Sequence, residues 1–267
     1  MPNGLDATLE MMPIRPMPQR ADSTAGLCLL FDPGARPGAD AVARLMEASA
    51  VSGLPASISH RPAPEAGWLE LLASGLTFDL VGLDPGAPGR MVEAQQRFGF
   101  ADDAVPSRGE CIELVPSGHI ISGAGLQPVL RTMMGLAANL VLDLPVRAVG
   151  WGPAQTWMDP RYFCRTVLNW LGGGAFPALG LTALHTAEDG SLISRGLAHF
   201  TGQEMQLEGR PDETAADTGK LAVRVIDQLV RRGRIAEPLR IDAGGKALLV
   251  EPSQVGKLVL VWREDEG

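Results

Sequence analysis

The segment between residues 178 and 208 decides the fold that we expect for this chain. It reads Ala178-Leu-Gly-Leu-Thr-Ala-Leu-His-Thr186, continues through a polar connection that contains Asp189-Gly190, and ends in Gly196-Leu-Ala-His-Phe-Thr-Gly-Gln-Glu-Met-Gln-Leu-Glu208. Two apolar runs joined through an Asp-Gly pair are typical of a β-hairpin. We therefore expect residues 178–186 and 196–208 to pair as its two strands.

The second arm of this hairpin changes phase along its length. Ala198 and Phe200 place apolar side chains at even positions, whereas Met205 and Leu207 place them at odd positions. Because side chains along a strand alternate with a period of two, one extra residue must be absorbed between the two pairs. Gly202 lies there, and we expect a β-bulge at this glycine.

Apolar periodicity predicts further strands and helices on both sides of the hairpin. Strands are expected at residues 26–31, 56–60, 76–83, 111–115, 147–151, 246–250 and 258–262, and helices at 40–46, 129–144, 159–171 and 221–230, with a helical turn at 68–72 and a short helix at 91–98. The strand at 258–262 is apolar throughout, which predicts an inner strand covered on both faces. Together the elements predict an α+β fold, a mixed α/β sandwich with a largely antiparallel or mixed sheet and packed helices.

Composition suggests how the chain is divided. Residues 1–25 are rich in Pro and Met and lack periodicity, so we expect a flexible N-terminal tail. The Gly- and Pro-rich stretch at 84–110 separates an α/β half at 26–110 from an α+β half at 111–267. The two halves are expected either as separate domains or as one continuous domain.

Charge and cysteine content exclude several classes of protein. The 267 residues carry 31 acidic and 23 basic side chains, a net charge of −8, and no basic stripe, which argues against a nucleic-acid partner. No apolar stretch approaches the ~20 residues of a membrane span, and the N-terminus does not resemble a signal peptide. Cys28, Cys111 and Cys164 form no Cys-x-x-Cys pair. We therefore expect a cytoplasmic protein with no membrane partner and no zinc ribbon.

The hairpin is where titratable side chains are expected to converge. If its strands pair around Asp189-Gly190, His185 and His199 would face each other, with Glu188, Asp189 and Glu204 nearby. Such a group would suit acid–base catalysis or metal-assisted chemistry. No His-x-His or His-x-x-x-His spacing supports a metal site, so neither a metal nor a cofactor is expected.

The turn at Ser122–Gly125 resembles the start of a dinucleotide-binding fingerprint. The third glycine of that pattern would fall at Pro128, which has no N–H to offer a phosphate. The alternative is a tight turn that needs glycine for its conformation.

Aromatic and charged residues supply further candidates for ligand binding. Trp151 and Tyr162 would either line a pocket or pack in the core. Arg195 and Glu204 would either pair at the edge of the strand or present a charge to a ligand.

Three segments carry a resemblance to a known family: Val149-Gly-Trp-Gly-Pro153, Phe176-Pro-Ala-Leu-Gly180 and Arg195-Gly-Leu-Ala-His-Phe-Thr-Gly-Gln-Glu-Met205. In these segments, and more loosely toward the C-terminus, the chain resembles the bacterial domain-of-unknown-function family 4261. The resemblance implies a bacterial cytoplasmic α+β protein and assigns no catalytic residue.

The sequence contains no complete catalytic motif, so enzymatic activity is not the primary expectation. We expect a non-enzymatic module that contacts a protein partner or another copy of itself, through a sheet edge or through the aromatic end near Trp151. The alternatives are a small metal-assisted or acid–base enzyme using His185, His199 and Glu204, and nucleotide binding at Ser122–Gly125.

Overall fold

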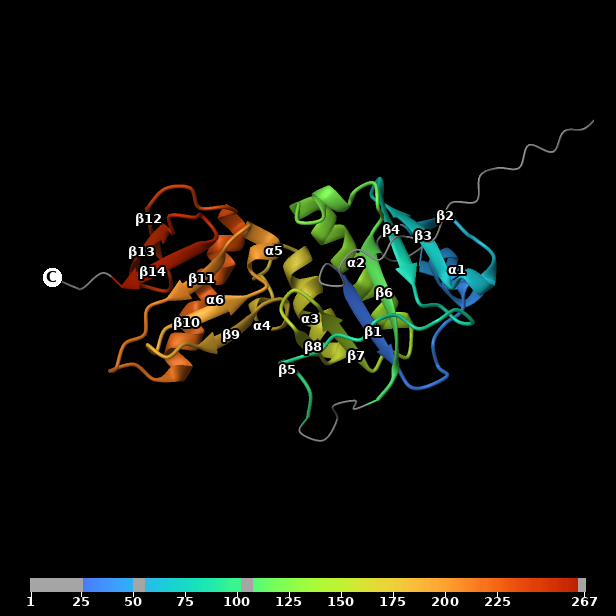
Figure 1. Cartoon of the computed structure of the whole chain (residues 1–267), viewed down its shortest axis with the longest axis horizontal. Helices are drawn as coiled ribbons and strands as arrows, with labels where there is room; N and C mark the ends of the chain where they lie inside the picture. Colours follow the sequence, from blue (N-terminus) through green and yellow to red (C-terminus); the bar gives the residue numbers. More distant parts are fainter. Residues whose placement is uncertain (1–25, 50–55, 102–107, 264–267) are drawn as a thin grey trace, which may run out of the picture.

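The computed structural model describes residues 26–49, 56–101 and 108–263, which form an α+β fold with two β-sheets. Figure 1 shows an elongated molecule with one sheet toward each end and helices between them. The expected tail at 1–25 lies outside the described residues.

The first sheet has eight strands in the order β2-β3-β4-β6-β1-β7-β8-β5. Neighbouring strands are antiparallel except β5 and β8, which run parallel. The strands are β1 Leu27–Phe31, β2 Ala56–His60, β3 Trp68–Ala73, β4 Leu76–Val81, β5 Gln96–Phe98, β6 Glu110–Pro116, β7 Ala148–Trp151 and β8 Thr156–Met158. The sheet takes strands from both expected halves of the chain, 26–110 and 111–267.

Both faces of this sheet are covered at its centre. Leu29 of β1 is fully buried in the main core. Cys28 and Leu30 point to the other face, where they pack with Trp157 beneath residues 92–100. A strand buried on both faces needs no polar alternation, which explains why β1 is apolar at every position.

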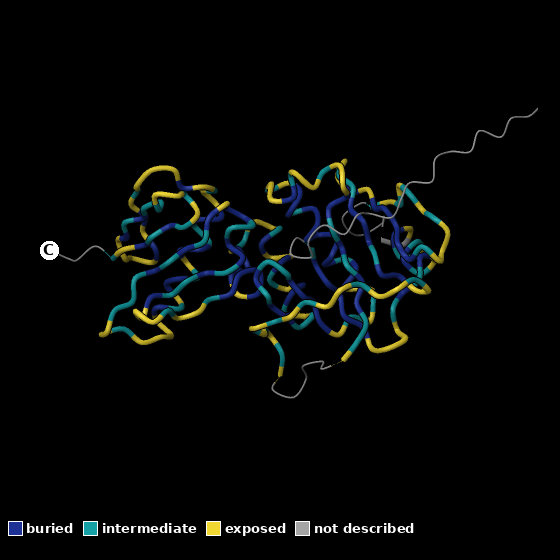
Figure 2. Tube along the Cα trace, in the orientation of Figure 1, coloured by how far each residue is buried: buried dark blue, intermediate teal, exposed yellow. Residues whose placement is uncertain are grey.

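Three helices pack against the eight-stranded sheet: α1 Ala39–Ser49, α2 Gln127–Asp143 and α3 Pro160–Leu171. The α2 helix has Pro128 in its first turn, where the missing N–H costs no hydrogen bond. The α3 helix begins after Asp159, whose carboxylate accepts hydrogen bonds from the backbone N–H groups of Arg161 and Tyr162 at 2.9 and 3.1 Å. Figure 2 shows that the interior strands and helices are buried while the connecting loops are exposed.

The second sheet has six strands in the order β12-β13-β14-β11-β10-β9. Its neighbours are antiparallel except β11 and β14, which run parallel. The strands are β9 Ala183–Thr186, β10 Leu192–Arg195, β11 Glu204–Leu207, β12 Leu239–Asp242, β13 Ala247–Pro252 and β14 Leu258–Arg263.

The helix α6, Ala215–Arg232, packs its apolar side with one face of the six-stranded sheet. Thr214 caps its start by accepting a hydrogen bond from the backbone N–H of Asp217 at 3.1 Å. Buried residues of α6 and of both sheets belong to one continuous hydrophobic core. The two ends of the molecule are thereby joined by packing.

Two expected helical segments are wrong. Residues 68–72 form most of strand β3, and residues 91–98 contain no helix but end in the short strand β5. β3 is held on both sides by β2 and β4, and β5 pairs with β8. These contacts with distant segments override a short helical spacing, because local preference is weak over so few residues.

A hairpin lies in this segment, but the expected pairing of residues 178–186 with 196–208 is wrong, because β10 lies between β9 and β11 and pairs with both. The hairpin consists of β9 and β10 and spans residues 183–195. Residues 178–181 form the short helix α4, so the first strand begins five residues later than expected, at Ala183. Residues 198–201 form the short helix α5, and β11 follows it.

Gly202 is not a β-bulge. It ends α5 with a φ of +79°, in the left-handed region that glycine adopts easily. The change of phase between Phe200 and Met205 therefore arises because a helical turn interrupts the extended chain. A bulge and a one-turn helix produce the same shift in the apolar pattern.

Candidate functional site

Glu204, a candidate catalytic residue, has a structural role at the start of β11. Its carboxylate accepts hydrogen bonds from the backbone N–H groups of Gly196, Leu197 and Ala198 at 2.8, 3.2 and 3.2 Å. The hydroxyl of Ser194 donates a fourth hydrogen bond at 2.5 Å. An ionised carboxylate has about four lone-pair sites, so these donors occupy its capacity. Glu204 holds the chain between β10 and α5 in place.

Arg195 does not pair with Glu204. Its guanidinium donates to the side-chain oxygen of Gln95 at 2.7 Å and also to that of Gln155. The arginine thus links the six-stranded sheet to residues 95 and 155 beside the eight-stranded sheet. It does not present a free charge to a ligand at the strand edge.

His199 lies on α5 and packs in an aromatic cluster. Its ring meets that of Trp151 edge-on, with 5.0 Å between centroids, and lies 5.7 Å from that of Phe200. Its Nε2 atom is buried and has no hydrogen-bond partner. Burial lowers the pKa of the imidazole, because the charged form loses hydration that nothing nearby replaces.

His185 and His199 do not face each other across a ladder. His185 is an exposed residue of β9, and its cross-strand partner is Ile193. Within residues 26–49, 56–101 and 108–263, no group of three or more His, Cys, Asp or Glu side chains is placed to hold a metal ion. The pairing fails because the segment that carries His199 is helical.

The Ser122–Gly125 turn packs against α5. It contains a single 3₁₀ turn at 121–123 and leads into α2. A Cβ atom added at Gly125 would lie 3.1 Å from the carbonyl oxygen of His199. The glycine therefore permits a close approach to α5. Neither Gly123 nor Gly125 has a positive φ, so the expected need for a glycine-specific conformation is not met. A carbonyl oxygen at this position would repel the phosphate of a nucleotide.

Trp151 and Tyr162 serve packing in the structure. Trp151 is completely buried, and its indole N–H donates to the carbonyl oxygen of Leu181 at 2.9 Å. The hydroxyl of Tyr162 donates to the carbonyl oxygen of Leu179 at 2.9 Å. Both aromatic residues hold the chain around α4.

The six-stranded sheet has one face that α6 does not cover, which we call the open face. Alternation places Met205, Leu207, Val259 and Val261 on the α6 side, where all four are buried. The strand registers place the opposite side chains together on the other side. The open face comprises His185, Ile193, Arg195, Glu204, Gln206, Glu208, Arg240, Asp242, Ala247, Leu249, Glu251, Leu258, Leu260 and Trp262.

Large apolar side chains on the open face are accessible to solvent. Trp262 is 40% exposed, and Leu249, Leu258 and Leu260 are half-buried. The expectation that 258–262 is covered on both faces is therefore wrong, although β14 is an inner strand. The apolar run of β14 indicates burial on one side and an accessible apolar surface on the other.

A hollow of about 120 Å³ lies on the open face. Its wall and floor are formed by Asp189, Ser191, Gln206, Glu208, Gly209, Leu260, Val261 and Trp262. Pockets for small ligands usually enclose about 300–1,000 Å³, so this hollow has room for a side chain but not for a cofactor.

Hydrogen bonds hold the polar side of the hollow. The carboxylate of Asp189 accepts from the hydroxyl and the backbone N–H of Ser191 at 2.6 and 2.9 Å. Gln206 donates from its amide to the Ser191 hydroxyl at 2.9 Å. The hydrogen bonds from Ser191 hold the pKa of Asp189 below its usual range, so this carboxylate is ionised near neutral pH.

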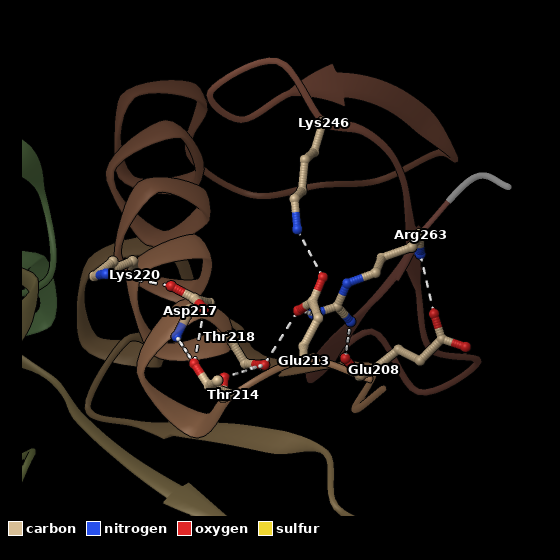
Figure 3. A network of polar contacts seen from close by, with 8 residues as sticks. All are labelled: Glu208, Glu213, Thr214, Asp217, Thr218, Lys220, Lys246 and Arg263. Carbon is tan, nitrogen blue, oxygen red and sulfur yellow. Dashed lines mark hydrogen bonds and ion pairs between the residues drawn. The ribbon is translucent and has the colours of Figure 1, made fainter. Parts of the chain in front are cut away.

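A polar network fixes the other end of the hollow. Figure 3 shows Glu208 beside Arg263, whose backbone N–H donates to the Glu208 carboxylate at 3.1 Å. The Arg263 side chain is only 4% exposed and contacts Glu213 at 2.5 Å, and Lys246 contacts the same carboxylate at 2.6 Å. Hydrogen bonding to Lys246 and Arg263 lowers the pKa of Glu213. The network ties the end of β14 to the segment that leads into α6.

Two signals in the sequence pointed to the open face. Gln206 and Glu208 alternate with Met205 and Leu207, which is typical of a strand with one solvent-exposed face. Trp262 follows a run of apolar residues, and an aromatic side chain at the end of such a run is compatible with either a core or a surface. The position of Asp189 beside this face depends on the β9–β10 turn.

Comparison of the chain with protein-family models, with curated proteins and with solved structures found no match in any of the three. The fold and the open face define an α+β protein with one accessible, partly apolar sheet surface. Membership of family 4261 remains a prediction. None of the described helices is both long enough and apolar enough to cross a membrane.

Proposed function

We propose that this protein is a non-enzymatic interaction module that binds another protein through the open face of its six-stranded sheet. The observation that carries the proposal is the exposure of Trp262 beside half-buried Leu249, Leu258 and Leu260 on one continuous surface. Removing such a surface from water stabilises a complex by about 25 cal/mol per Å² of apolar area, before the costs of association. Tryptophan is also enriched among residues that dominate binding energy.

The sheet edges support this role less well. The edge strand β2 has a register shift between Ile58 and His60. At the edge strand β9, the carbonyl oxygen of Leu184 accepts a hydrogen bond from Gln96 at 2.5 Å, and at β12 the carbonyl of Asp242 accepts one from Gln228. Bulges and occupied backbone groups protect edges from pairing with another chain. The face, and not an edge, therefore supports binding best.

The alternative functions find little support in the geometry. The carboxylate of Glu204 is engaged by four donors, and the ring of His199 lies against Trp151. The aromatic end near Trp151 offers no contact surface, because that residue is completely buried. A cytoplasmic location belongs to the proposal as well, since the three cysteines are buried free thiols.

The partner that we propose is a different protein with an apolar centre and basic flanks. The part of the open face around the hollow carries Glu208 and Glu251, and Asp189 lies at its side, whereas Arg240 lies on the edge strand β12, opposite Leu249. Two copies meeting through the acidic part would bring these carboxylates together and repel each other. Charge complementarity thus favours a partner with Lys or Arg around its contact surface.

Site-specific photo-crosslinking in the cells that produce the protein tests the proposal. A photoreactive residue in place of Leu258 should capture a partner that the same residue in place of Leu142 does not. Leu142 lies on α2 and is 61% exposed, so it is a matched accessible control. Crosslinks of equal yield at both positions, or at Leu142 alone, would contradict the proposal.

Affinity for the captured partner then gives a quantitative test. Leu260→Asp should weaken binding by more than about tenfold, or about 1.4 kcal/mol, and Leu142→Asp should leave it unchanged. Equal affinities of the two variants would overturn the proposal. Size-exclusion chromatography tests whether a second copy of the chain covers the open face. A dimer that Leu260→Asp dissociates would show that a second copy, and not a different protein, covers it.

A further inference from the structure

We propose that the hollow on the open face receives an arginine side chain of the protein partner. This inference rests on the proposed function and specifies which group of the partner the face recognises. Three features of the hollow carry it: its carboxylates, its apolar and aromatic wall, and its size.

The hollow has a negative charge that the described chain does not neutralise. Asp189 and Glu208 both line it, and no basic side chain does. Within the described ranges, neither carboxylate forms an ion pair with a Lys, Arg or His side chain. The guanidinium of Arg263 donates to Glu213 and to the backbone carbonyl of Glu208. A cation in the hollow would therefore meet two available carboxylates.

The rest of the lining suits a side chain with an apolar stem. Leu260 and Trp262 form an apolar and aromatic wall beside the two acids. The indole N–H of Trp262 donates to Glu251 at 3.0 Å, which holds the ring in position on the face. The methylene groups of a long basic residue can pack on such a wall while its charged head reaches the carboxylates.

Arginine fits these features better than lysine. Its guanidinium is planar, stacks on aromatic rings and donates up to five hydrogen bonds in a fixed geometry that matches carboxylates. An ammonium is more strongly hydrated and loses more on entering a half-enclosed site. The volume of about 120 Å³ admits one side chain and excludes larger ligands.

Titration with a small probe tests the hollow without the partner. The probe is N-acetyl-arginine amide, and the neutral isostere N-acetyl-citrulline amide is its control. The readout is the NMR signal of the Trp262 indole N–H, assigned by its loss in Trp262→Phe. We expect a saturable shift with a Kd of about 1–20 mM for the arginine probe, as for one exposed charge and stacking contact, and no saturable shift for the citrulline probe.

Variants of the two acids separate charge from fold. Asp189→Asn and Glu208→Gln keep an acceptor for their hydrogen bonds with Ser191 and Arg263, and each should weaken the arginine probe at least threefold. Glu188→Gln removes an exposed acid that does not line the hollow and should have no effect. No shift with the arginine probe, equal binding of citrulline, or equal binding of N-acetyl-lysine amide would overturn the assignment to arginine.

The partner's affinity distinguishes this inference from the proposed function. If Leu260→Asp abolishes partner binding while the Asp189→Asn, Glu208→Gln double variant binds normally, the open face binds a partner and the arginine assignment fails. If the arginine probe binds but neither Leu260→Asp nor the double variant affects the partner, the hollow is a cation site and the proposed function fails. Loss of partner binding in both variants supports both statements.

Discussion

The two sheets of this protein differ in what covers them. The eight-stranded sheet is buried at its centre on both faces, by helices on one side and by residues 92–100 on the other. The six-stranded sheet carries α6 on one face and leaves the other accessible around Trp262. Apolar strand side chains are therefore buried at the centre of the eight-stranded sheet, where they stabilise the fold. On the open face of the six-stranded sheet, similar side chains remain accessible to solvent.

The largest effect is expected for Leu29→Ala, at the centre of the eight-stranded sheet. Leu29 is fully buried, and its strand neighbours are Ile112 and Val149. Truncation leaves a cavity with little room to relax, so we expect a loss of about 3 kcal/mol in the free energy of unfolding. Urea denaturation followed by circular dichroism measures it. A loss below about 1 kcal/mol would show that the helix-covered face of this sheet is not closely packed around Leu29.

Glu204→Ala tests the junction between the sheets. The substitution leaves the N–H groups of Gly196, Leu197 and Ala198 without their acceptor. We expect a loss of about 2 kcal/mol in the free energy of unfolding, because unsatisfied buried donors are costly. Glu188→Ala, an exposed acid of the neighbouring turn, should change stability by no more than about 0.5 kcal/mol. If both variants are equally stable, the carboxylate of Glu204 is free for another role.

His199 should make stability depend on pH. Its pKa is lowered in the folded state by burial, so the unfolded chain binds the proton more readily. Stability is then greatest above the ordinary pKa of about 6.5 and falls as the pH decreases below it, by no more than about 1.4 kcal/mol per pH unit. His199→Phe keeps a ring against Trp151 and should flatten the profile between pH 7 and pH 5.5. An unchanged slope in this variant would assign the pH dependence to other groups.

The smallest effect on stability is expected for Leu260→Ala on the open face. Leu260 is half-buried and borders the hollow, so truncation leaves no closed cavity. We expect a loss of less than about 1 kcal/mol, clearly below that of Leu29→Ala measured in the same way. A loss as large as that of Leu29→Ala would mean that this side of the sheet belongs to the core, and the comparison between the two sheets would fail.

Local signals predicted the long elements well. Apolar side chains recurring every three or four residues predicted the helices α2, α3 and α6. Pro128 and Asp159 also indicated where α2 and α3 begin. The strands β1, β2, β4, β6 and β7 also lie where apolar runs between turn residues place them. The one-turn helices α4 and α5 were missed because a single turn has too few residues to establish a period.

The candidate site was predicted less well, because its members are neighbours only in space. His185 and His199 have suitable chemistry, but His185 pairs with Ile193 of β10 and His199 lies on the helix α5. Glu204 was expected to serve catalysis or ligand binding, whereas its carboxylate accepts hydrogen bonds from a turn that no pattern revealed. Asp189 and Trp262 are far apart in the sequence and line one hollow.

The fold class, the long helices and most strands follow from the sequence alone, because these depend on spacing within a single segment. Which strands pair, what Glu204 and Arg195 contact and which sheet face stays open depend on contacts between segments that are distant in the sequence. An apolar side chain such as Leu29 or Leu260 has the same preference for burial in the sequence. What distinguishes them is whether another part of the chain lies against that face, which is a property of the packed molecule.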